Sequence, residues 1–411
     1  MALGTFARKY ANKFGISLAY SYLCRMNYAR HTLEDLGVTA ETACFAPCGG
    51  VAEWHVMLHV APRGEMFADQ LQRLYAAQER LLTLPGMEGA RCVMKRYFLS
   101  DSTNQQPLMR RESGVAVSVI QQQPLDGSKV AVWMYLQRGM EMTEEHGMVV
   151  LRHNGYQHLW QMGMCCHESE DALHTESSAW QTEKLLKDYE EGLSHFQATL
   201  ADHCLRTWFF VRDVDTQYMG MVRARRDNFT QQGLTSQTHY ISSTGIGGLP
   251  ADTRSLIQLG AYALTGFAPS QQRYLYAPTH LNPTYEYGVT FERGTLMQYG
   301  DRDHVIISGT ASINNKGEVL HVGDIVQQTH RMWENVEKLL EEGGCDFSDV
   351  MHVIVYLRDT ADYDIVSRLF AERFPHIPTV ITLAPVCRPT WLIEMECMAV
   401  KAAHHEEFRE Y

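Results

Sequence analysis

The chain has 411 residues, of which 45% are hydrophobic and 20% are charged, and its formal net charge is −12. This length allows two or three domains of ordinary size with a sizeable buried core. The negative charge argues against nucleic acid or an anionic membrane surface as a general partner, so an anionic substrate would need a local basic pocket.

Residues 1–20 lack the apolar core of a secretory signal, and no later apolar run has the length that a bilayer requires. We therefore expect a cytoplasmic chain that does not enter a membrane.

The ten cysteines are scattered through predicted strands, which is typical of reduced thiols. The local groupings are Cys44 with Cys48, and Cys165 and Cys166 with His167. Neither has the two-pair spacing of a zinc site, so we expect no metal. No cofactor motif appears in the sequence, so we expect no cofactor.

Predicted strands and helices alternate in a pattern that occurs three times. In the first occurrence the elements are a strand over 54–58, a helix over 66–84, a strand over 97–101, and strands over 115–123 and 129–137 around a turn at 124–127. In the second they are a strand over 156–162, a helix over 178–200, and strands over 209–213, 238–247 and 255–267. In the third they are a strand over 304–313, a turn at 314–317, a helix over 324–342, a strand over 350–359, a helix over 363–374 and a strand over 384–400.

We interpret the chain as three tandem strand-strand-helix-strand-helix-strand units over residues 1–145, 146–284 and 285–411, with the second helix short or degenerate in the first unit. In each unit a hydrophobic strand ends in an aspartate, at Asp101, Asp213 and Asp359. The alternative is a chance similarity of strand ends, because helix and strand alternate in many mixed folds.

The last predicted strand carries two glutamates. Its period of two places Glu394 and Glu396 on one face, together with Leu392. Burial raises the pKa of a carboxyl group and a second carboxylate raises it further, so one of the pair can hold a proton near neutral pH. The alternative is an edge strand with two solvated glutamates. The matching strands of the other units carry no Glu or Asp, which favours a single active cleft with the third unit as one wall and the second unit as the other.

Several segments of the third unit resemble the YjgF/Rid superfamily in order and spacing: GTASI, HVGDIVQQTHRMWENVEKLLEEGG, VIVYLRD and LIEMECMAV. GTASI together with VCRPTWLIEMEC is more similar to the chorismatase branch than to the small enamine and imine deaminases. The similarity extends into the second unit through the segments 205–213, 225–229 and 243–247, and it includes the segment 291–294 before GTASI. Gly233-Leu234 and Asn314-Asn315-Lys316 depart from the chorismatase pattern, and residues 1–145 lie outside the resemblance.

The resemblance implies an α+β fold of three fused Rid-like units, also called chorismate mutase-like ββαβαβ units. Because Rid proteins assemble as homotrimers with sites between subunits, the fused units are expected to form a pseudo-trimer. A monomeric chain and a further assembly both stay open.

The resemblance also implies site residues. Glu394 is the expected general acid or water-positioning group, Glu396 is the second choice, and Cys387 is a wall residue. The candidates for binding the carboxylates of a small anionic metabolite are Arg388, Arg293, Arg226 and Tyr240. In the deaminases an arginine precedes the cysteine by two positions, where this chain has Pro385.

Three functions follow from these features. A chorismatase-like enzyme would protonate the enol ether of chorismate, or of a similar unsaturated carboxylate, and release pyruvate. A Rid-type deaminase would protonate an enamine or imine substrate in a related way. A non-catalytic module would bind a small ligand or a protein without chemistry.

Overall fold

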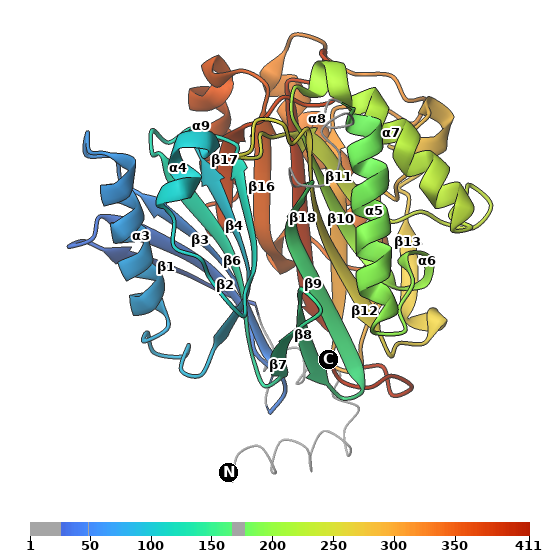
Figure 1. Cartoon of the computed structure of the whole chain (residues 1–411), viewed down its shortest axis with the longest axis horizontal. Helices are drawn as coiled ribbons and strands as arrows, with labels where there is room; N and C mark the ends of the chain where they lie inside the picture. The colour runs from blue at the N-terminus through green and yellow to red at the C-terminus, as the bar shows by residue number, and fades with distance from the viewer. Residues whose placement is uncertain (1–25, 48, 167–176) are drawn as a thin grey trace.

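The computed structural model describes residues 26–47, 49–166 and 177–411 (Figure 1). Their strands form three six-stranded sheets. The first contains β1 (Asn27–Leu33), β2 (Val38–Phe45), β3 (Ala52–Val60), β4 (Arg91–Leu99), β5 (Ala116–Gln121) and β6 (Val130–Arg138). The second contains β7 (Glu141–Glu145), β8 (Met148–His153), β9 (Tyr156–Cys165), β10 (Cys204–Val211), β11 (Ser242–Gly247) and β12 (Ile257–Thr265). The third contains β13 (Gln272–Leu275), β14 (Gly294–Gln298), β15 (Arg302–Ala311), β16 (Val350–Leu357), β17 (Thr379–Leu383) and β18 (Ile393–Ala402).

The three sheets have the same topology. Their orders are β1-β2-β3-β6-β4-β5, β7-β8-β9-β12-β10-β11 and β13-β14-β15-β18-β16-β17. In each sheet the fourth and fifth strands along the chain pair in parallel, and all other pairs are antiparallel. The predicted α+β fold of three repeated units is therefore confirmed, with six strands in each sheet instead of the four of the predicted unit.

The helices follow the same repeat. The long first helices are α3 (Phe67–Leu81), α5 (Ser178–Ser194) and α8 (Ile325–Glu342), and the second helices are α4 (Ser102–Gln105), α7 (Val214–Gln231) and α9 (Tyr363–Arg373). A further short helix, α6 (Leu200–His203), precedes β10. With only 4 residues, α4 confirms that the second helix of the first unit is degenerate.

The repeated aspartates stand where each central strand passes into a helical turn. Asp101 accepts a hydrogen bond from the backbone N–H of Asn104, and Asp359 accepts one from that of Ala361. Asp213 adopts a left-handed conformation with φ of 48° at the start of α7. These residues satisfy or adjoin the free N–H groups of a helix start, which explains the repeat in the sequence.

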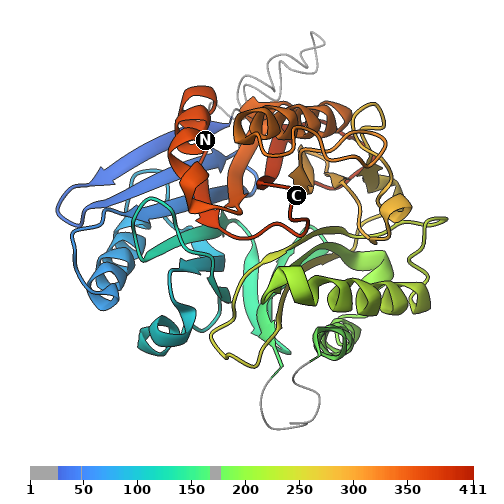
Figure 2. The same cartoon turned by 90° about the horizontal axis from the view of Figure 1, so that it is seen from above.

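Three equivalent backbone hydrogen bonds close the units into a ring. In each, the N–H of the last residue of one unit's fifth strand donates to a carbonyl in the loop before the last strand of the next unit. The pairs are Gln121 to Leu249 at 3.0 Å, Gly247 to Pro385 at 2.9 Å, and Leu383 to Gln123 at 2.8 Å. Seen from above, the units surround a common centre with their long helices outside (Figure 2).

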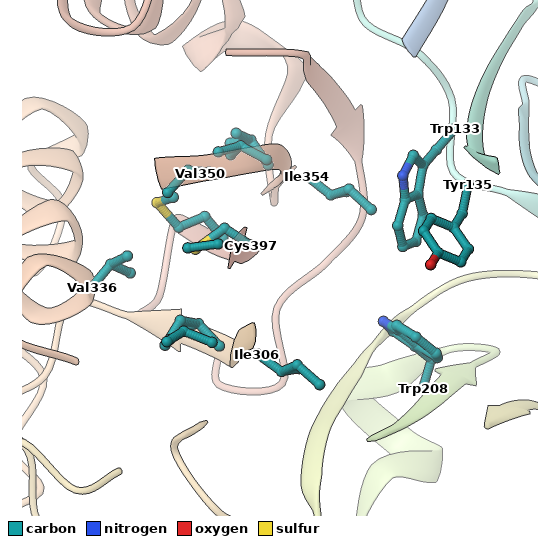
Figure 3. Packing of buried hydrophobic residues seen from close by; sticks show 14 of the residues in the cluster. Trp133, Tyr135, Trp208, Ile306, Val336, Val350, Ile354 and Cys397 are labelled. Atoms are coloured by element: carbon teal, nitrogen blue, oxygen red, sulfur yellow. The ribbon is translucent and has the colours of Figure 1, made fainter. Parts of the chain in front are cut away.

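The hydrophobic core continues across the unit boundaries. Val336, Val350 and Cys397 pack inside the third unit, whereas Trp133 and Trp208 approach it from the first and second units (Figure 3). Burying aromatic and aliphatic surface between units stabilises the ring by roughly 25 cal/mol for each Å² of apolar area removed from water.

Pairing within a sheet places β7 with the second sheet and β13 with the third. It does not show where an independently folding domain begins, so the unit boundaries after residues 145 and 284 stay predictions. Among the helices of the described residues, none is both long and apolar enough to cross a membrane.

Candidate active site between the second and third units

Both glutamates of β18 are buried, with 5% of Glu394 and 2% of Glu396 exposed. The strand lies between β15 and β16, where Glu394 pairs with Ala311 on one side and Tyr356 on the other. The alternative of an edge strand with solvated glutamates is therefore wrong. Burial of two neighbouring carboxyl groups requires either partners or a bound proton.

Glu396 is held as an anion by groups from the other two units. One carboxylate oxygen accepts from Arg206 Nη2 at 2.7 Å, and the other accepts from Trp208 Nε1 at 2.8 Å and from Arg96 Nη1 at 3.3 Å. Burial alone would raise the pKa of Glu396, but the two guanidinium groups outweigh it and lower the pKa. Glu396 thus anchors three units rather than donating a proton.

Glu394 has the opposite protonation behaviour. Burial, and then repulsion from Glu396, raise its pKa from 4.5 to about 8, although Arg206 and Arg293 pull it down. At neutral pH this carboxyl group carries a proton. The pair is therefore split into one anion and one acid, the arrangement by which two carboxyl groups acquire different roles.

Glu394 lies at a cavity of about 130 Å³ between the second and third units. The second unit contributes Tyr218, Met219, Arg225, Ser243 and Gly245, and the third contributes Tyr287, Val289, Phe291, Arg293, Gly309, Ala311, Ile313, Cys387, Arg388, Trp391 and Glu394. The aromatic and aliphatic groups form most of the wall, with an acid and several cations among them. A small unsaturated acid has the chemistry that such a lining can recognise.

The equivalent positions of the other units do not carry an acid. In each unit one residue of the last strand pairs with the residue that lies three positions before the repeated aspartate. These equivalent residues are Glu394 opposite Tyr356, Gln258 opposite Phe210 and Ala131 opposite Phe98. Gln258 accepts a hydrogen bond from Ser118 Oγ at 2.7 Å and donates to the carbonyl of Val119 at 3.1 Å. Neither an amide nor a methyl group can supply a proton. Of the three equivalent positions, only that of Glu394, in the cleft between the second and third units, therefore carries a proton donor.

Arg225 replaces the predicted Arg226 in the site. Its guanidinium is buried, with Nε donating to Thr290 Oγ1 at 3.2 Å and Nη1 to Ser243 Oγ at 3.4 Å. Nη2 is buried without a hydrogen-bond partner in the described part of the chain. Arg226, one residue further along α7, points outward and pairs with Asp227. The prediction of Arg226 is corrected because one residue turns a helix by about 100°.

Arg293 and Arg388, two of the predicted carboxylate-binding candidates, both line the cavity. Arg293 is buried, donates to the carbonyl of Asn282 at 3.0 Å and lies over the ring of Tyr287. Arg388 lies over Tyr287 and Trp391, with its Cζ 4.7 and 4.6 Å from the ring centroids. Stacking on aromatic faces holds these guanidinium groups in place, and Arg388 Nη1 also donates to the carbonyl of Gly317 at 3.3 Å.

Tyr240 does not line this cavity. It borders a neighbouring cavity of about 310 Å³, which Arg293 separates from the first because Arg293 lines both. The backbone N–H of Tyr240 donates to Glu292 at 2.8 Å. Tyr240 precedes β11, which begins at Ser242, and it is not among the residues that line the cavity with Glu394.

Cys387 lies in the cavity wall. Burial, and then the nearby Glu394, raise the pKa of its thiol to about 12. The thiolate is the nucleophilic form of cysteine, so this environment suits a wall residue rather than a nucleophile.

Sequence reasoning missed Arg225 and Gly309. The signal for Arg225 was present, because Tyr218, Met221, Val222 and Phe229 share its helix face at spacings of three and four. Gly309 lies within the GTASI motif, but the reason for a glycine there depends on the neighbouring strand. A Cβ atom at Gly309 would lie 2.1 Å from Glu394 Oε1.

Changing Gly309 to Ala should therefore displace the Glu394 carboxyl group. A shift of this size is expected to reduce turnover about 100-fold, because small misplacements of a reacting group have such effects. The comparison is Gly245→Ala, which adds the same methyl group to the opposite wall, near Tyr218 and Met221. Equal turnover in the two variants, measured at saturating substrate, would mean that the position of Glu394 is not critical.

The raised pKa of Glu394 also predicts a pH dependence of stability. Between its ordinary value of 4.5 and about 8 the folded chain keeps a proton that the unfolded chain has lost. The contribution of Glu394 to the free energy of unfolding is thus full below pH 4.5 and falls by ~1.4 kcal/mol for each pH unit up to about pH 8. Urea unfolding of the parent and of Glu394→Gln from pH 5 to 9 measures this fall. Parallel curves for the two proteins would contradict it.

Among the described residues, no three His, Cys, Asp or Glu side chains gather as a metal site, and the described cysteines are free. Cys48 and His167, which belong to the two local groupings in the sequence, lie outside the described residues.

Part of the chain is similar in sequence to known proteins. A family model described as Endoribonuclease L-PSP matches residues 297–401. The 3-aminoacrylate deaminase RutC of Acinetobacter baylyi is 35% identical over 71 residues, which are 17% of this chain and 56% of that protein. This chain therefore spans little more than half the length of that relative. A RutC family protein of Pyrococcus abyssi is 33% identical over 99 residues, which are 24% of this chain and 78% of that protein.

Among solved structures, a chorismatase crystal structure superposes with a TM-score of 0.58 at 19% identity, covering 77% of this chain and 95% of that one. This similarity concerns the fold. The RutC-like matches fall on one part of the chain, whereas the chorismatase match extends over more than one of its three sheets.

Proposed function

The chain belongs to the YjgF/Rid superfamily, to which RutC belongs, and on this premise we propose that it is an enzyme that protonates a carbon–carbon double bond of a small unsaturated carboxylate. The observation that carries the proposal is the buried carboxyl group of Glu394, with its raised pKa, at a cavity that also contains Arg225, Arg293 and Arg388. A buried acid with a pKa near the working pH is an effective proton donor, and arginines bind carboxylates.

Chorismate is the substrate that these groups suit best. Its enol ether has a methylene carbon that can accept the proton of Glu394, which leaves an oxocarbenium ion and a Glu394 carboxylate. Water then adds to the cation and returns a proton to Glu394. The resulting hemiketal breaks its bond to the ring oxygen, so the products are pyruvate and a ring alcohol. The shared fold with a chorismatase supports this choice.

The cavity also provides for the two negative charges of chorismate. Arg225 has an unpartnered Nη2, and Arg293 and Arg388 line the same cavity while each also donates to a backbone carbonyl, of Asn282 and of Gly317. Cationic groups in a site with little water bind anions more strongly than they would in solution. A small dianionic metabolite is therefore the partner that we propose for this cleft.

A deaminase activity is the second candidate, and one observation favours it. The arginine that Rid deaminases place two positions before the cysteine is replaced by Pro385 in this chain, but Arg225 reaches the same cavity from the second unit. The acid on β18 could protonate the carbon of an enamine such as 3-aminoacrylate, the substrate that the RutC relative is named for. Water would then attack the iminium carbon and ammonia would leave. A silent binding module would use the same cavity without either reaction.

The test is to incubate the purified protein with chorismate and to follow pyruvate through lactate dehydrogenase. Release of pyruvate supports the proposal. Ammonia release from 3-aminoacrylate, without pyruvate from chorismate, would favour the deaminase instead. Binding of chorismate without either product would identify a binding module and overturn the enzymatic proposal.

Two neighbouring arginines of α7, Arg225 and Arg226, give a matched pair of variants that tests which of them binds the substrate carboxylate. Arg225→Met should raise KM for the substrate carboxylate about 10- to 100-fold, because a charged hydrogen bond is worth roughly 1.5–3 kcal/mol. Arg226→Met removes an exposed guanidinium and should leave KM and kcat unchanged. If steady-state kinetics give both variants the same KM, Arg225 does not contact the substrate.

A further inference from the structure

A second cavity, of about 30 Å³, lies where the three units meet. Each unit contributes to its wall: His55 and Trp133 from the first, Trp160 and Arg206 from the second, and His352 from the third. Trp133, Tyr135 and Trp208 point into this region opposite Ile306 and Ile354 (Figure 3). The volume suffices for a water molecule or two, or for one monatomic ion.

Hydrogen-bond donors without partners face this cavity. The indole N–H of Trp133 donates to Nδ1 of His55 at 3.1 Å, so the proton of the neutral His55 ring sits on Nε2. Burial lowers the pKa of His55 to about 3, which keeps the ring neutral. Nε2 of His55, Nε1 of Trp160 and Nη1 of Arg206 are all buried and lack a partner in the described residues. His352 Nδ1 is also buried without a partner in the described residues, and as a neutral ring nitrogen it can be either a donor or an acceptor.

Acceptors in the same wall are already occupied. None of the unpartnered buried oxygen atoms of the described residues belongs to a residue that lines this cavity. Glu396, the nearest carboxylate, already accepts from two arginines and an indole. At the other end Glu53 accepts from Arg302 and His304. A water molecule could accept from the free N–H groups, but among the buried unpartnered atoms of the described lining residues only His352 Nδ1 could accept one of its protons.

At the end of the cavity that contains the unpartnered N–H groups, the local positive charge favours an anion over a water molecule. Arg96 and Arg206 share the single carboxylate of Glu396. Arg96 is fully buried, lies 5.2 Å from the centroid of Trp133 and 5.0 Å from that of Trp208, and has two further unpartnered nitrogens. Two guanidinium groups with one carboxylate leave an excess positive charge in a region from which water is excluded, and such a charge requires a counterion.

We infer that this central cavity binds one monovalent, halide-sized anion through the N–H groups of His55, Trp160 and Arg206. The ion contacts elements of different units, so it stabilises the folded ring and not the unfolded chain. It lies at a site other than the cleft with Glu394, and its binding does not depend on any catalytic activity.

The test is thermal unfolding in sodium bromide against sodium gluconate at constant ionic strength, because gluconate is too large for the cavity. Tm should rise with bromide and level off at saturation, as binding to the folded state requires. Crystals grown in bromide should show an anomalous difference peak between Trp160 and Arg206. Water density at this position, with the same Tm in both salts, would overturn the inference.

Two tryptophan variants refine the test. Trp160→Phe removes one donor from the cavity and should weaken bromide binding about tenfold. Trp54→Phe removes an indole from the separate core of the first unit and should retain the parent's bromide dependence. Both variants are expected to lose some stability through packing, so the comparison uses the rise of Tm with bromide rather than Tm itself. Equal rises in the two variants would contradict the assigned ligands.

Discussion

Changing Glu394 to Gln is expected to reduce turnover about 10²- to 10⁴-fold, the range that a general acid contributes. The amide has the shape of a protonated carboxyl group but cannot release a proton to carbon. The chain itself carries this substitution in another cleft, where Gln258 occupies the equivalent place. Substrate should still bind to the variant, since Arg225 and Arg293 are unchanged.

The measurement is kcat for pyruvate release, together with substrate affinity by calorimetry. The variant should fold normally, because a neutral amide replaces a neutral acid. Loss of turnover with retained affinity supports proton donation by Glu394. Retained turnover would place the acid elsewhere, and loss of both binding and turnover would mean that Glu394 mainly shapes the cavity.

Changing Arg302 to Met is expected to lower the free energy of unfolding by about 3–5 kcal/mol, the cost of removing one partner of a buried ion pair. Arg302 lies on β15 of the third unit and Glu53 on β3 of the first, and neither is exposed. Arg302 Nη1 donates to Glu53 Oε1 at 2.5 Å, and Nη2 donates to the carbonyl of Val51 at 2.6 Å. These contacts join the ends of the chain's first and last sheets, so their loss should open the ring there.

Urea unfolding at neutral pH measures this effect, with Arg226→Met as the surface control. Combining Arg302→Met with Glu53→Gln removes one of the two buried carboxylates that pair with Arg302, the other being Asp301, and should restore part of the stability, as expected for two groups that interact directly. A single variant as stable as the control would show that the ring does not depend on this pair. Additive losses in the double variant would show that the two groups act separately.

Local signals in the sequence predicted much of the fold. The aspartates at 101, 213 and 359 are helix-start residues, and their recurrence gave the correct number of units. The helices over 67–81, 178–194 and 325–342 have strong apolar periodicity and were predicted to within a few residues at most ends. The edge strands β1, β7, β13 and β17 were missed, because half-exposed edge strands lack a continuous apolar run.

The site was only partly predictable. Glu394, Cys387, Arg388 and Arg293 were identified, and the structure brings all four to one cavity. Arg226 was preferred to Arg225 although the helix period pointed to the latter. The three partners of Glu396 come from two other units, and no local pattern indicates that strands so distant in sequence meet at one carboxylate. The difference in protonation between Glu394 and Glu396 therefore depends on tertiary packing.

The central claim is that Glu394 carries a proton at neutral pH in the cleft between the second and third units. Its most direct test is the infrared difference spectrum between the parent protein and Glu394→Gln, recorded as a function of pH. A protonated carboxyl band that is present at pH 7 and disappears with a pKa of about 8 is the predicted result. A band that is lost near the ordinary value of 4.5 would contradict the claim, because Glu394 would then be an anion when the reaction requires an acid.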